Sequence, residues 1–86
     1  MEETRNWLIQ WFVDNANGDE KTLRENMAEN YFDKGFIDSF TFISLIAEIE
    51  ENFQIEFDNE QFADRSFATV AGLAQMIEKL RGNHGQ

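Results

Sequence analysis

A serine that directly follows an aspartate is the place where the residue types point to covalent chemistry. Ser39 lies in the segment Gly35-Phe36-Ile37-Asp38-Ser39-Phe40, just before an apolar helical pattern. A serine hydroxyl can serve as an attachment point or as a nucleophile. Ser or Asp before an apolar run is also the usual signal for a helix start. From these residues alone, an N-cap is the ordinary explanation of Ser39.

Other kinds of active site have little support. His84, the only histidine, lies near the end of the chain between two glycines, where no scaffold would hold it as a general base. Glu48 and Glu51 are three residues apart on a presumed solvent face, which favours a solvated helix surface over paired catalytic carboxylates. There is no Cys and no spacing typical of metal ligands. We expect no catalytic residue, no metal site and no enzyme.

The composition is that of one small domain. The chain has 86 residues, 42% of them hydrophobic, and nine Phe, two Trp and one Tyr supply large buried areas. We expect a single domain over residues 1–81 and a flexible tail over 82–86. The absence of Cys, of a basic and apolar leader and of any apolar run long enough to span a membrane favours a cytoplasmic protein.

Negative charge dominates the chain and is concentrated in its middle. The net charge is −10, and residues 36–64 contain eight acids but no Lys or Arg. Such a surface repels nucleic acid and anionic lipid, so we expect neither as a partner. It would attract basic patches on other proteins, although acidic surfaces often serve solubility alone.

Helical periodicity predicts three main helices. The first runs from Thr4 to Asn15, with an apolar face of Trp7, Leu8, Trp11, Phe12 and Val13. Residues 19–27 could form a short exposed helix, but they have few apolar positions and are assigned to a long first loop. The last helix runs from Val70 to about Arg81 and is capped by Thr69. Before it, residues 54–57 form an extended link that buries Ile55 and Phe57, followed by one helical turn at 59–63.

The middle helix begins at Asp38-Ser39 and carries two apolar stripes. The stripe aimed at the core consists of Phe42, Leu45, Ile46, Ile49 and Phe53. Phe40, Ile43 and Ala47 lie on a different side, and Glu50 and Glu51 continue their line. This spacing predicts a partly exposed apolar strip edged by acids, or else one wide stripe that buries more surface. The predicted fold is all-α, a bundle of three main helices plus one short helix with a long first loop.

Taken together, three landmarks make the chain resemble the acyl carrier protein family over nearly its whole length. Residues 35–45 are similar to the Gly-apolar-Asp-Ser-Leu attachment signature of that family. Residues 50–55 resemble the acidic end of its second helix, and residues 66–70 the Thr-Val start of its fourth. The Gly-Phe-Ile-Asp-Ser form looks closer to acyl and D-alanyl carriers than to peptidyl carriers.

The resemblance implies that Ser39 bears 4′-phosphopantetheine, donated by coenzyme A, and that the arm carries an acyl or aminoacyl group as a thioester. It also implies that Asp38 supports attachment by a separate phosphopantetheinyl transferase. Further implied partners of the expected monomer are a loading ligase and a downstream synthase or transferase with basic docking patches. The residues expected to recognise them are Phe40, Ile43, Ala47, Glu48, Glu50 and Glu51.

Departures from the family pattern concern the docking surface. Phe40 stands where Leu is usual, and Thr41 and Ser44 occupy positions that are often acidic in fatty-acid carriers. These differences favour a specialised pathway, fatty-acid-like, polyketide or other, with its own ligase. Three alternatives stay open: an aminoacyl or peptidyl carrier, an unmodified acidic helical adaptor and, more remotely, a hydrolase that would need a fixed His84.

Overall fold

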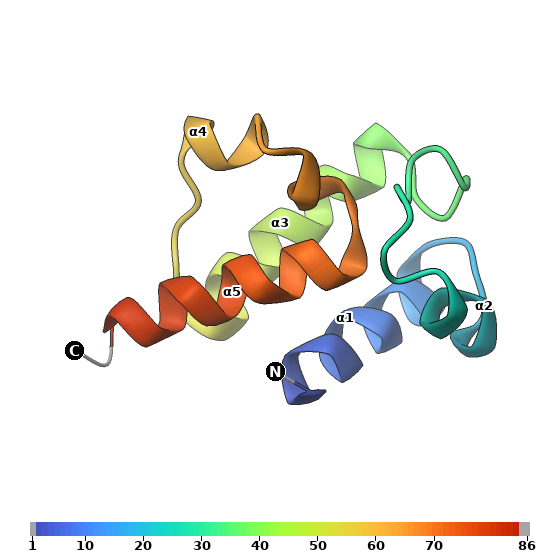
Figure 1. Ribbon diagram of the computed structural model, residues 1–86, viewed down its shortest axis with the longest axis horizontal. Helices are drawn as coiled ribbons and strands as arrows, with labels where there is room; N and C mark the ends of the chain where they lie inside the picture. The colour runs from blue at the N-terminus through green and yellow to red at the C-terminus, as the bar shows by residue number, and fades with distance from the viewer. Residues whose placement is uncertain (1, 85–86) are drawn as a thin grey trace.

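The computed structural model describes residues 2–84, and over that range the chain is helical with no β-strand (Figure 1). This confirms the predicted all-α fold with three long helices and a long first loop. Met1, Gly85 and Gln86 lie outside the described residues, and with them the end of the predicted tail. In chain order the elements are α1 (Glu2–Asn15), α2 (Glu20–Glu25), α3 (Ser39–Phe53), α4 (Asn59–Phe62), the 3-10 helix η1 (Arg65–Ala68) and α5 (Val70–His84).

Helix α1 begins two residues earlier than predicted, because Glu2 and Glu3 suit the positive end of a helix dipole. Leu8, Ile9, Trp11 and Phe12 form its buried face, together with the polar Thr4. Two of the five residues predicted for that face behave differently: Val13 is exposed and Trp7 is half-buried. The helix ends where predicted, and Gly18 three residues later has a φ of +126° that favours glycine.

The long first loop contains a short helix, which the sequence offered only as the less favoured alternative. Residues 19–27 were assigned to irregular structure, which is wrong for α2. One apolar residue is enough here, because Leu23 is fully buried in the common core. Arg24 Nε also donates to Glu20 Oε2 at 3.0 Å, an i,i+4 pair that supports the single turn and a half.

Helix α3 has a clear start and stop. Asp38 caps its first turn, and Gln54 adopts a left-handed conformation (φ 58°) that ends it. The predicted core stripe is confirmed: Leu45, Ile46 and Ile49 are buried, and Phe42 and Phe53 are half-buried against the same core. The extended link that follows buries Ile55, also as predicted.

The predicted short turn is confirmed as α4, which the side chain of Asp58 caps. The cap predicted for the last helix is also confirmed, since Thr69 Oγ1 accepts a hydrogen bond from the Gly72 N–H at 2.9 Å. Gly72 is required for packing: a Cβ there would lie 2.0 Å from the Ser66 carbonyl oxygen of η1. Helix α5 continues to His84, three residues past the predicted end.

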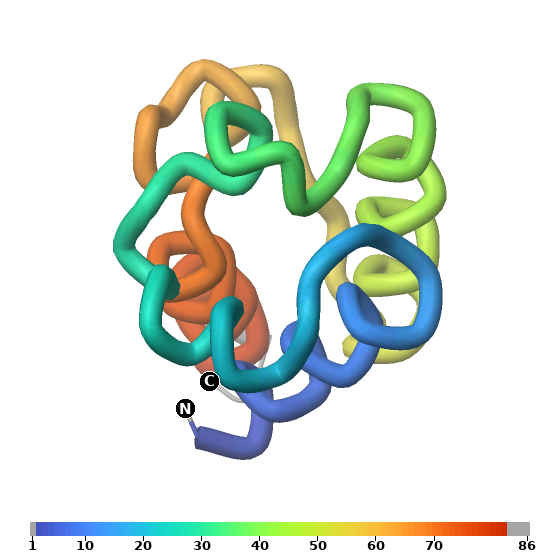
Figure 2. The backbone as a smooth tube through the Cα atoms, turned by 90° about the vertical axis from the view of Figure 1, so that its right-hand side faces the viewer, coloured from blue at the N-terminus to red at the C-terminus, as the bar shows by residue number. Residues whose placement is uncertain are grey.

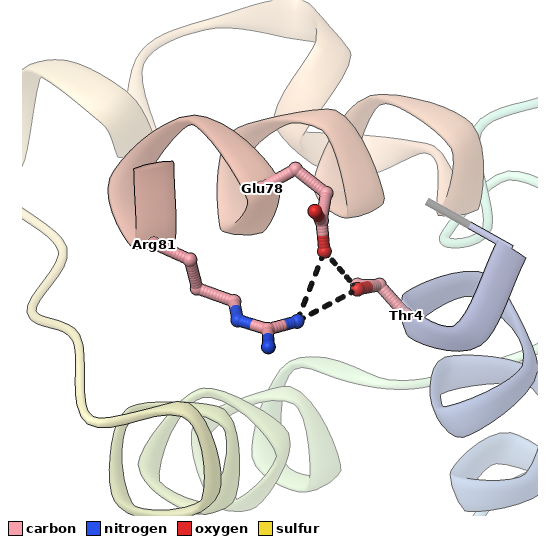
Figure 3. A network of polar contacts seen from close by, with 3 residues as sticks. All are labelled: Thr4, Glu78 and Arg81. Atoms are coloured by element: carbon pink, nitrogen blue, oxygen red, sulfur yellow. Dashed lines mark hydrogen bonds and ion pairs between the residues drawn. The ribbon is translucent and has the colours of Figure 1, made fainter. Parts of the chain in front are cut away.

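The first and last helices are joined by a polar contact at one end of the bundle (Figure 3). The Thr4 hydroxyl donates a hydrogen bond to Glu78, and Arg81 Nη1 lies 3.1 Å from Glu78 Oε2. The Arg81 guanidinium also lies 5.2 Å from the centroid of the Phe53 ring of α3. The tube in Figure 2 shows α1 beside both α3 and α5, so this contact helps to tie the three long helices together. Within residues 2–84, no helix is both long and apolar enough to cross a membrane.

Candidate functional site

The segment before Ser39 is held by buried aromatic and aliphatic side chains. Phe36 and Ile37 are both buried, and the backbone of Phe36 donates to the Tyr31 carbonyl at 2.9 Å and accepts from the Asn17 N–H at 2.8 Å. Gly35 has a φ of +74°, yet no atom lies within 4 Å of where its Cβ would be. No close approach therefore requires a glycine at this position, and its positive φ explains the residue.

Tyr31 anchors this loop to the start of the last helix. Its side chain is fully buried, its N–H donates to the Ala68 carbonyl at 2.9 Å and its hydroxyl donates to the Phe67 carbonyl. Burial raises the pKa of the phenol well above its usual value, so Tyr31 stays a neutral donor. The loop that carries Asp38 and Ser39 is thus fixed at its base.

The capping role at the start of α3 belongs to Asp38. Its Oδ1 accepts a hydrogen bond from the Thr41 N–H at 2.7 Å, and that bond is the main reason why the pKa of this carboxyl is lowered. Ser39 is the first residue of the helix and is exposed. Its hydroxyl makes no hydrogen bond to the described residues, so the interpretation of Ser39 as the cap is wrong.

The predicted exposed strip of α3 is confirmed as an exposed surface. Phe40 is 84% exposed and Ile43 is 69% exposed, and Ala47 and Glu51 are exposed as well. Both large side chains are close to Ser39 in the first turns of the same helix. Their role in partner recognition stays a prediction.

Two acids of the predicted recognition set have partners within the chain. Glu48 Oε2 accepts a hydrogen bond from the indole N–H of Trp11 at 2.8 Å, which turns the carboxylate toward α1. Glu50 Oε2 accepts from the backbone N–H of Phe57 at 3.0 Å and holds the link after α3. Trp11 and Glu48 are 37 positions apart in the sequence, so no spacing signal could have predicted the first contact.

A small pocket beside Phe42 of α3 was not predicted from the sequence. It has a volume of about 80 Å³, and Phe42, which lines it, is three residues after Ser39 and half-buried. The only hint in the sequence was the number of phenylalanines, which exceeds what the three helix stripes use. The residues that line the pocket are Phe32, Phe42, Phe62, Asp64, Phe67 and Ala68.

Comparisons with known proteins identify the family of this chain. The family model described as "Phosphopantetheine attachment site" matches residues 21–77, which include the loop, α3 and most of α5. The chain belongs to the phosphopantetheine-binding carrier proteins. It is 35% identical over 59 residues to the D-alanyl carrier protein of Streptococcus pyogenes serotype M5, and 30% identical over 59 residues to that of Bacillus mycoides. Each match covers 69% of this chain and 75% of the relative.

The predicted cofactor follows from membership: a carrier protein of this family holds 4′-phosphopantetheine covalently. Such carriers work with a phosphopantetheinyl transferase and with loading ligases. The start of α3 fits the group, because an exposed and unbonded hydroxyl lies at a helix N-terminus, where the positive end of the dipole favours a phosphodiester. No solved structure matches the chain significantly. Among the described residues, no group of three or more metal-ligating side chains comes together.

Proposed function

We propose that this carrier protein bears its arm on Ser39 and delivers a small acyl or aminoacyl group to partner enzymes, without catalysing a reaction itself. The observation that carries the proposal is the division of roles at the start of α3. Asp38 caps the helix, so the Ser39 hydroxyl is not needed as the cap, and Ser39 is exposed. Because the Ser39 hydroxyl makes no hydrogen bond within the described residues, its modification should not destabilise the fold.

Attachment needs a separate enzyme. The Ser39 hydroxyl loses its proton and its oxygen forms a phosphodiester with the pantetheine phosphate, while the nucleotide part of coenzyme A leaves. The nearby Asp38 is a poor base for that proton, because its carboxylate accepts the Thr41 N–H and has a lowered pKa. When bound, the group supplies a thiol that carries cargo as a thioester, which a chain without Cys cannot supply itself.

Two observations support a small cargo. The pocket beside α3 has only about 80 Å³, and phenylalanine rings fill the space around it, with Phe62 and Phe67 centroids 4.9 Å apart. The relatives from Streptococcus pyogenes and Bacillus mycoides are named for D-alanyl carriage. An aminoacyl group of that size, or a short acyl group, is the cargo that we infer.

Partner enzymes are proposed to bind the exposed strip formed by Phe40, Ile43 and Ala47, beside the acids that flank it. Such contacts should be small and transient, because a carrier must leave each enzyme. The Glu51 side chain is exposed, and its carboxylate makes no hydrogen bond or ion pair with the described residues, so its charge is available. Glu51→Lys should slow loading by about two- to fivefold at low salt, since a rim charge acts mainly on the association rate. Glu56→Lys is the matched control. Equal slowing in both variants would contradict the assignment of Glu51 to partner recognition.

The attachment proposal is tested by intact mass after incubation with coenzyme A and a broad-specificity phosphopantetheinyl transferase. The wild-type chain should gain the mass of one arm and Ser39→Ala should gain none. Circular dichroism should give the same helicity for both proteins. A modified Ser39→Ala protein would overturn the assignment. If neither protein gained mass, the rival of an unmodified acidic adaptor, which the exposed strip also fits, would be favoured.

The cargo is tested separately, by the mass of the protein isolated from its native host before and after treatment with hydroxylamine, which cleaves thioesters. A small loss that matches an aminoacyl or short acyl group is expected. Loss of a long acyl chain would contradict the size argument but would leave Ser39 as the attachment site.

A further inference from the structure

A groove between α1 and α3 is lined by acidic side chains and indole rings. Its volume is about 530 Å³, and it lies where the two helices run antiparallel, since Trp7 contacts Phe53 whereas Trp11 contacts Glu48. Figure 2 shows the two helices side by side. The groove shares Glu48 and Glu51 with the predicted recognition set, but it opens toward α1 and does not depend on modification of Ser39.

The aromatic side of the groove is held in place before any ligand binds. Trp11 is only 7% exposed, and its indole N–H donates to Glu48 Oε2 at 2.8 Å. The ring of Trp7 packs edge-on against Phe53, with centroids 5.2 Å apart. Both indole rings line the groove, and indoles are the best aromatic partners for cations; the half-buried ring of Trp7 is the one that a cation can reach, beside the edge of Trp11.

The charged side of the groove carries one sign only. Asp14, Glu48 and Glu51 line it, and none of the described residues that line it is Lys or Arg. Gln10 Nε2 donates to Asp14 Oδ1 at 2.9 Å and orients that carboxylate. Because α1 ends at Asn15 with no basic residue in its last turn, the negative end of its dipole adds to the field. Anions and nucleic acid are repelled from such a groove.

We propose that this groove receives an arginine side chain of a partner protein. A guanidinium is planar, stacks on aromatic rings and forms two parallel hydrogen bonds with a carboxylate, so it uses both sides of the groove. A lysine ammonium is a point charge that is more strongly hydrated, and it gains less from the indole rings. The arginine would give the partner a second contact, on the flank of α3 that faces α1.

The test is a titration of the full chain, without its arm, with N-acetyl-arginine amide at low salt, followed by the NMR signals of the two tryptophan indole N–H groups. A saturable shift of the Trp11 signal is expected, with a smaller effect of N-acetyl-lysine amide. N-acetyl-citrulline amide has nearly the shape of the arginine probe but no charge, and it should cause no saturable shift. An equal response to citrulline, or no response to arginine, would overturn the proposal.

Charge-neutralising variants give the second arm of the test. Glu48→Gln keeps an oxygen that can accept the Trp11 N–H, and Glu51→Gln loses no observed contact, so both should fold. Each should weaken binding of the arginine probe by a factor of about two to five. Glu56→Gln and Glu60→Gln, exposed acids outside the groove, are the matched controls. If they weakened binding as much, the probe would be responding to net charge and the groove would not be its site. Because no arm is present, this outcome is independent of the assignment of Ser39.

Discussion

The inner and outer sides of α3 differ sharply in burial. The inner side packs Leu45, Ile46 and Ile49 into the core that α1 and α5 share. The outer side leaves Phe40 84% exposed and Ile43 69% exposed, next to the free hydroxyl of Ser39. A helix needed only for stability would place polar residues there, so the contrast supports our proposal that partner enzymes bind the outer side.

The largest predicted effect comes from replacing one isoleucine on each side of α3 and comparing the two losses of stability. Ile49 is fully buried, so Ile49→Ala should cost about 2–5 kcal/mol of unfolding free energy through lost burial and a cavity. That is a large part of the total for a small domain, about 5–15 kcal/mol. Ile43→Ala should change it by less than about 0.5 kcal/mol. Urea denaturation measures both, and similar losses in the two variants would mean that the outer side is structural.

The second prediction separates the two roles considered for Asp38. Asp38→Asn keeps a side chain that can cap the helix, whereas Asp38→Ala removes the acceptor for the Thr41 N–H. Asp38→Ala should therefore lower the urea midpoint, by less than Ile49→Ala does, and Asp38→Asn should leave it nearly unchanged.

Attachment rates then test whether the carboxylate does more than cap. If Asp38 supports the transferase through its charge, attachment should slow in Asp38→Asn as well as in Asp38→Ala. Attachment at the wild-type rate in Asp38→Asn would reduce Asp38 to a helix cap.

The smallest predicted effect concerns pH and the contact in Figure 3. The hydrogen bond from the Thr4 hydroxyl is the main reason why the pKa of Glu78 is lowered from 4.5. A lowered pKa stabilises the fold above the unfolded value, and this gain is lost as pH falls through the folded value. Thr4→Val removes the donor, so its stability deficit should be largest near neutral pH and should shrink well below pH 4.5. Equal deficits at about pH 7 and pH 3 in urea would contradict this.

The periodic parts of the chain could be predicted, and contacts between distant segments could not. The stripe from Phe42 to Phe53 gave α3 and its buried side, because i, i+3 and i+4 spacing is a local property. Helix α2 was not favoured because Leu23 is its only buried residue, and a single apolar residue cannot form a periodic pattern. A capping role was the ordinary explanation of Ser39, but Asp38 takes that role; either side chain can accept the same N–H, and only coordinates distinguish them. The bond from Trp11 to Glu48, and the phenylalanine pocket, depend on how the helices meet in space.

The most direct test of the central claim is fragmentation mass spectrometry of the protein purified from its native host. Trypsin should release residues 35–65, which contain three hydroxyl side chains on α3: Ser39, Thr41 and Ser44. We predict that the fragment ions place the pantetheine arm on Ser39 alone. An arm on Thr41 or Ser44, or an unmodified peptide in cells that contain an active transferase, would contradict the account.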